Sequence, residues 1–152
     1  MIATYVVGGV GLALAFNAMA AGDTSTGAAW ASAVAVGGSG LLSFVRHSIF
    51  HRSDAARMRW DYGSRNDFQI EVGLANLAWG VVGIAAWALD WGVEAQGAVI
   101  LVFGLYLLFA GILHLSEAFA PQAAGGHRYA STVATFAFAS ALVVCGGLAL
   151  GG

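Results

Sequence analysis

The chain has 152 residues, of which 59% are hydrophobic and only 9% are charged, and its mean hydropathy is +0.79. This composition excludes an ordinary water-soluble domain and predicts an integral membrane protein that forms one domain over residues 1–152. The net charge is −2, and no basic stripe with interleaved aromatic residues occurs, which argues against a nucleic-acid-binding role.

Five segments contain the roughly 20 mostly apolar residues that a membrane-spanning helix needs. The first ends in Ala18-Met19-Ala20, which resembles a signal-peptide cleavage site, but no positive charge precedes its apolar run. We therefore expect a retained helix. The fold class predicted is an all-α integral membrane protein, a bundle of five transmembrane helices over residues 2–21, 28–50, 69–90, 96–118 and 129–150.

The longest connection joins the second and third spans. Within it, Ser53 and Asp54 are typical helix caps, and they predict a short helix through residues 55–60 that lies in the headgroup layer. Asp67 is expected to cap the third span, and Pro121 to stop the chain after the fourth.

The arginines indicate the orientation in the membrane. All six lie at or in the connections between spans two and three and between spans four and five. In the other connections, the only charged residues are acidic. The positive-inside rule predicts a multi-pass protein of the cell's inner membrane with a cytoplasmic N-terminus and an extracytoplasmic C-terminus. Trp30, Trp87 and Trp91 then lie near the outer interface, where aromatic residues gather.

Most of the other ionisable side chains fall at the same cytoplasmic level of three different spans. His47 and His51 are four residues apart in the last turns of the second span, which places them on one helix face. Glu71 occupies the first turn of the third span, and His114 and Glu117 are three residues apart in the last turns of the fourth. His127 begins the fifth span on the same side.

Imidazole together with carboxylate suits Fe(II), Mn(II) or Zn(II), so this set predicts a divalent metal site. Helical bundles build di-metal sites from Glu-x-x-His pairs, but the order here is His-x-x-Glu and too few glutamates are present, so a single ion fits better. Haem is less favoured, because a second histidine pair at the opposite face is missing. The expected metal ligands are His47, Glu71 and His114, with His51 and Glu117 as further or supporting ligands, and Gln69, Asn76, Arg46 and His127 as substrate-binding or supporting groups.

Three functions remain open for this cluster. A metal with an open coordination position would serve a small redox or hydrolytic enzyme. Structural His–Glu pairs and glycine-rich faces would instead suit an accessory subunit of a membrane complex or a homo-oligomer. A proton- or cation-coupled transporter would need a polar path through the outer half, where only Asn17, Asn76 and Ser or Thr residues could supply one. For Asn76, a hydrogen bond between helices is the commoner role.

The third span carries the pattern F-Q-x-E-x-G-x-A-N-L-x-x-G-x-x-G-I over residues 68–84. This pattern, following a helix that ends in spaced histidines, resembles a family of small uncharacterised bacterial and archaeal membrane proteins. The resemblance extends from His47 to Ile84, with an echo at residues 111–114, but the Asn-rich continuation expected after Glu117 is missing. It implies that Gln69, Glu71 and Asn76 occur together with the histidines, and it implies no particular activity.

Overall fold

The computed structural model describes residues 2–58, 67–118 and 127–151, and these parts of the chain are helical apart from short turns. Five helical stretches are long and apolar enough to cross a membrane, which confirms the predicted fold class. Their elements, in chain order, are α1 (Ile2–Ala20), α2 (Thr24–Trp30), η1 (Ala31–Gly38), α3 (Ser39–Phe44), η2 (Val45–Ile49), α4 (His51–Met58), α5 (Asp67–Ala88), α6 (Val93–Ala118) and α7 (His127–Gly151).

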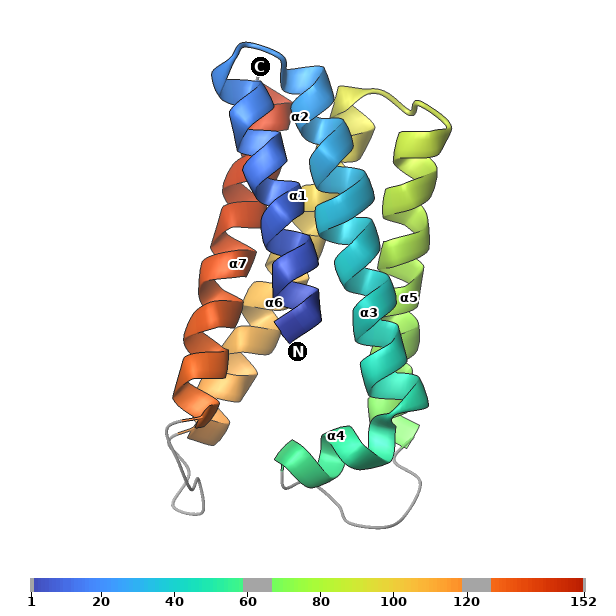
Figure 1. Ribbon diagram of the computed structural model, residues 1–152, viewed down its shortest axis with the longest axis vertical. Helices are drawn as coiled ribbons and strands as arrows, with labels where there is room; N and C mark the ends of the chain where they lie inside the picture. Colours follow the sequence, from blue (N-terminus) through green and yellow to red (C-terminus); the bar gives the residue numbers. More distant parts are fainter. Residues whose placement is uncertain (1, 59–66, 119–126, 152) are drawn as a thin grey trace.

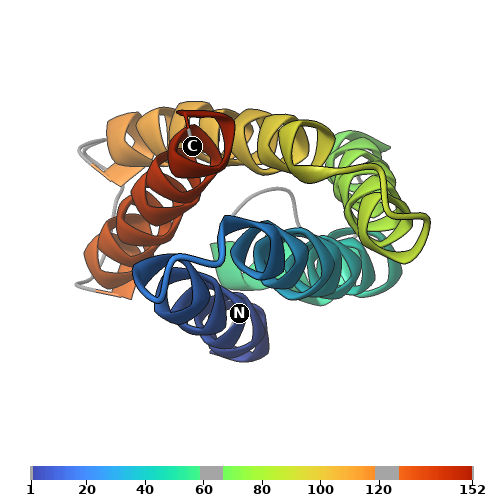
Figure 2. The same ribbon diagram turned by 90° about the horizontal axis from the view of Figure 1, so that it is seen from above.

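The second span is one continuous rod made of α2, η1, α3 and η2, and it runs from Thr24 to Ile49. It begins four residues before the predicted start at residue 28, and the other spans match their predicted ranges to within a few residues. Seen from above, the spans follow one another around the bundle in chain order, so that α7 returns to lie beside α1 (Figure 2). This up-and-down arrangement follows from the short connections, because helices joined by few residues pack as antiparallel neighbours.

Close helix contacts depend on glycine. A Cβ atom added to Gly40 of α3 would lie 2.7 Å from the Cα atom of Gly80 in α5, and one added to Gly11 of α1 would lie 2.5 Å from the backbone nitrogen of Ala35. Since lipid supplies no hydrophobic drive between helices, such close backbone approach is a main source of association energy in a membrane. The glycine faces predicted from the sequence are therefore packing surfaces.

The end of the bundle that holds the C-terminus carries two tight turns (Figure 1). Asp23 caps α2 by accepting a hydrogen bond from the Thr26 N–H at 2.9 Å, and this bond lowers the pKa of the Asp23 carboxyl group. The turn between α5 and α6 contains two left-handed residues, Asp90 with φ 48 and Gly92 with φ +86, and only the glycine adopts this conformation at no steric cost. The exposed tryptophans Trp87 and Trp91 lie at this end, opposite the predicted site.

Two parts of the second span, η1 and η2, are π-helical rather than α-helical. A π-helix bonds each N–H group to the carbonyl five residues earlier and is uncommon outside functional segments. In η1, the Ser32 hydroxyl donates to the Gly83 carbonyl of α5 at 2.8 Å, which ties the two spans together. In η2, the wider turns carry Arg46 and His47 at the end of the membrane span.

Candidate functional site

An elbow in the chain builds the polar end of the bundle. The second span ends at Ile49, and Phe50 leaves helical geometry with φ −99 and ψ 26 before α4 begins at His51. The short helix α4 then runs across the end of the bundle instead of along it (Figure 1). It begins earlier than the predicted short helix, so Asp54 lies inside its first turn. The elbow turns this residue back toward η2.

The Asp54 carboxylate is the centre of a buried ion-pair cluster. Arg46 donates from Nε to Asp54 Oδ1 at 2.7 Å, and His47 Nδ1 lies 3.0 Å from Asp54 Oδ2. The Asp54 side chain is only 3% exposed, compared with 22% for Arg46 and 15% for His47. A buried carboxylate is tolerated only when cations and hydrogen bonds replace its water. The pair therefore holds α4 against η2.

Gln69 on α5 completes the surroundings of His47. Its side chain is 1% exposed, and its Oε1 lies 3.2 Å from His47 Nδ1. Because the Gln69 amide oxygen can only accept, we assign the ring hydrogen of His47 to Nδ1. The other ring nitrogen, Nε2, then carries the lone pair in the neutral ring. An oxygen acceptor that fixes the tautomer of a histidine in this way is a common support of a metal ligand or a general base.

The Nδ1 atom of His51 also faces an oxygen acceptor, in this case a backbone carbonyl. Its Nδ1 lies 2.9 Å from the Ser48 carbonyl oxygen, which also can only accept, so His51 Nδ1 carries the hydrogen. Its Nε2 is buried and has no hydrogen-bond partner among the described residues. Ser48 is itself held to α5, because its hydroxyl donates to the Ile70 carbonyl at 3.0 Å. In the tautomers that we assign, Nε2 is the ring nitrogen without a hydrogen in both histidines.

The structure describes the surroundings of only some of the predicted ligands. Glu71 is exposed, on the side of α5 away from the buried Gln69. His114 follows Gly111 of α6, which faces the ring of Phe136 on α7, whereas His47 lies against α5. The Glu117 side chain and the His127 side chain lie outside the described residues. Within the described ranges, no three His, Cys, Asp or Glu side chains lie close enough to hold a metal ion, so the three-helix metal site stays a prediction.

Asn76 plays the commoner of its two expected roles. It is 3% exposed at the middle of α5 and donates from Nδ2 to the Val72 carbonyl at 2.8 Å and to the Tyr106 hydroxyl of α6 at 3.2 Å. The bond to Tyr106 joins two spans inside the membrane, as polar side chains commonly do there. Asn76 is therefore separated from the cluster at the bundle end.

Asp54 is the residue that sequence reasoning missed, because it was interpreted as a helix cap. The signal that could have found it is a carboxylate close behind two histidines, in a connection otherwise rich in arginine. Its burial also depends on the elbow at Phe50, and no residue pattern predicts that elbow.

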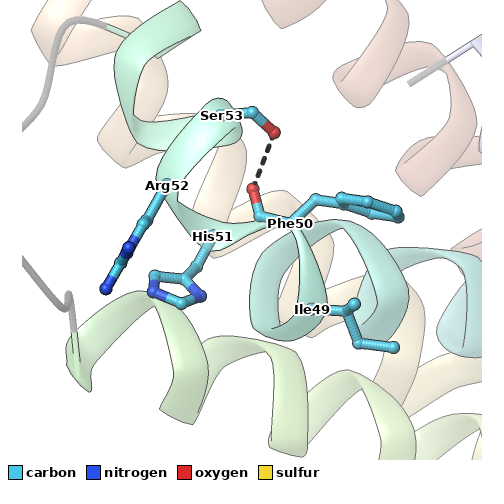
Figure 3. A pocket seen from close by; sticks show the side chains of 5 residues that line it. All are labelled: Ile49, Phe50, His51, Arg52 and Ser53. Carbon is cyan, nitrogen blue, oxygen red and sulfur yellow. Dashed lines mark hydrogen bonds between the residues drawn. The ribbon is translucent and has the colours of Figure 1, made fainter. Parts of the chain in front are cut away.

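Next to this cluster, the elbow leaves an open hollow of about 370 Å³ on the surface. Its lining combines apolar, basic and hydroxyl side chains from five consecutive residues, Ile49, Phe50, His51, Arg52 and Ser53 (Figure 3).

These features define a multi-pass helical membrane protein with a buried His–Asp–Arg cluster at one end of its bundle. The chain belongs to a family of unknown function, DUF6790, whose match covers residues 1–149. No curated protein and no solved structure matches the chain. The membership agrees with the expected likeness to an uncharacterised family, while the sharing of the F-Q-x-E pattern within it stays a prediction.

Proposed function

We propose that the protein binds a divalent metal ion at the end formed by η2 and α4, through the Nε2 atoms of His47 and His51. The observation that carries this proposal is that Nδ1 of each ring lies within hydrogen-bond distance of an oxygen acceptor. The tautomer that we assign from these contacts leaves the lone pair of each Nε2 for a metal ion. Imidazole ligands suit Zn(II) and Fe(II), and water or a substrate oxygen would complete the coordination.

Asp54 has a supporting role in this proposal. It orients His47 and raises the basicity of its Nε2, and Arg46 keeps the carboxylate in place. Glu71 and His114, together with His47, remain the residues of the competing three-helix site. The two possible metal sites can be distinguished by substitution. Replacing His51 should remove the metal from the first site, and replacing His114 should remove it from the second.

The test is elemental analysis of protein purified in mild detergent, followed by removal of metal with a chelator and titration with Zn(II). We expect His47→Ala and His51→Ala to abolish stoichiometric binding and Asp54→Asn to weaken it about 10- to 100-fold, as loss of a supporting group does. Acidification should release the metal, because ligating histidines must be neutral. His114→Ala is the matched control and should bind normally.

Two results would overturn this proposal. Wild-type protein without saturable Zn(II) binding would remove the metal site altogether. An equal loss of binding in His114→Ala would favour the ligand set drawn from three helices.

A second candidate function is favoured by the 2.7 Å contact between Arg46 and Asp54. The same cluster would then only lock α4 to the bundle, and the protein would serve as an accessory subunit of a membrane complex or as a homo-oligomer. In that case, stability should depend on Arg46 and Asp54 while a chelator has no effect on it.

We also propose that this polar end faces the cytoplasm and that the membrane is the inner membrane of the cell. The support is the distribution of the arginines along the sequence, since five fall within residues 46–65 and the sixth, Arg128, is the second residue of α7.

A further inference from the structure

The hollow at the elbow lies where the second span leaves the apolar part of the bundle. Ile49 is the last residue of that span, and α4 starts two residues later across the bundle end. Residues at such a position lie at the depth of lipid headgroups, with hydrocarbon on one side and water on the other.

Arg52 supplies the hollow with an uncommitted positive charge. It is exposed, and no carboxylate of the described residues lies within ion-pair distance of it, whereas Arg46 is already bound to Asp54. A guanidinium group presents five N–H donors in a planar fork that matches the oxygens of a phosphate group. The polar part of the lining therefore fits an anionic phosphate.

Ile49 and Phe50 give the same hollow an apolar wall. Their side chains are 59% and 58% exposed, although both are large and hydrophobic. Figure 3 shows Arg52 and these two residues on different sides of the elbow, within one set of lining residues. A soluble phosphate would make no contact with the apolar side chains of Ile49 and Phe50. A phosphate that carries hydrocarbon would cover them.

We propose that the elbow binds an anionic phospholipid, with its phosphate on Arg52 and the start of its acyl chains against Ile49 and Phe50. This site shares the lining residue His51 with the proposed metal site, but its charged group is the exposed guanidinium of Arg52 and not an imidazole nitrogen. The bound phospholipid would hold α4 at the membrane surface.

The test uses native mass spectrometry of the full chain in mild detergent, with a chelator present so that no metal takes part. The probes are phosphatidylglycerol and phosphatidylcholine with the same acyl chains. We expect wild-type protein to retain phosphatidylglycerol more tightly. Arg52→Gln should weaken phosphatidylglycerol binding about fivefold, the usual effect of one arginine at an anionic surface, and leave phosphatidylcholine binding unchanged. Arg52→Lys should restore part of the preference.

The apolar wall has its own matched control. Ile49→Ser should weaken the binding of both lipids, whereas Leu89→Ser, at a 67% exposed position near the other end of the bundle, should weaken neither. An unchanged lipid preference in Arg52→Gln would overturn the proposal. So would displacement of phosphatidylglycerol by millimolar inorganic phosphate alone, because the site would then recognise phosphate without its hydrocarbon. Loss of metal binding leaves the lipid result untouched, so the two proposals fail independently.

Discussion

Replacement of Asp54 by Asn tests whether the buried carboxylate holds α4 to the bundle. Removing one partner of a buried ion pair costs about 3–5 kcal/mol. Here the cost is smaller, because Arg46 and His47 keep 22% and 15% of their side chains exposed and can regain water. Asn also keeps one oxygen that can accept from Arg46. We therefore expect a loss of about 2 kcal/mol, which is roughly a 30-fold rise in the opening equilibrium of α4.

The loss should be local, because in the described part of the chain α4 packs mainly against η2 and α5. Amide hydrogen exchange, followed by mass spectrometry in lipid-free detergent, reads this opening directly. Peptides that cover residues 51–58 should exchange faster in Asp54→Asn, and peptides from α6 and α7 should not change.

Arg52→Gln is the matched control, since it removes an exposed charge from the same helix without breaking an ion pair. Its exchange should stay within about twofold of wild type, as is usual for surface substitutions. Combining Asp54→Asn with Arg46→Gln should cost less than the sum of the single changes, because both remove the same contact. Wild-type exchange rates in Asp54→Asn would refute the reasoning.

Two further predictions concern packing and orientation. Gly40→Ala should lower the stability in detergent by about 1–3 kcal/mol, because its Cβ atom would meet the Gly80 backbone at 2.7 Å; Gly9→Ala, where the new atom has nothing within 4 Å, should leave the melting temperature unchanged or raise it. A topology reporter fused after Gly152 should be extracytoplasmic, and a cytoplasmic signal would contradict the proposed orientation.

The spans were predictable because a bilayer admits only long apolar helices with internally satisfied backbones. The position of the polar residues near the ends of the spans was predictable for the same reason, because a bilayer disfavours them in the middle of a span. The side of the helix on which some of these polar residues lie was also partly predictable from the sequence. Gln69, Gly73, Asn76 and Gly80 recur at intervals of three and four and form the buried face of α5. Glu71 lies two residues from Gln69, about 200° around the helix, and so faces outward.

The elbow was not predictable from local patterns. A continuous helix would stack His47 on His51, but η2 is π-helical and the chain breaks at Phe50, so the two histidines belong to different helices. Tertiary contacts accompany the break, among them the Ser48 bond to Ile70 and the Arg46 bond to Asp54. Neither contact has a signature in the sequence, because each joins residues of two different helices.

The position of Asp54 also explains why the end of the bundle can hold so many polar groups. An intramembrane carboxylate is costly unless it is paired, and α4 brings one to Arg46 and His47 from the membrane surface instead of from within a span. The same helix carries His51, so the two Nε2 donors and their supporting carboxylate depend on one docked segment. Any change that undocks α4 therefore removes Asp54 and His51 together. A metal bound at both histidines would in turn favour the docked state, because a ligand stabilises the conformation that binds it.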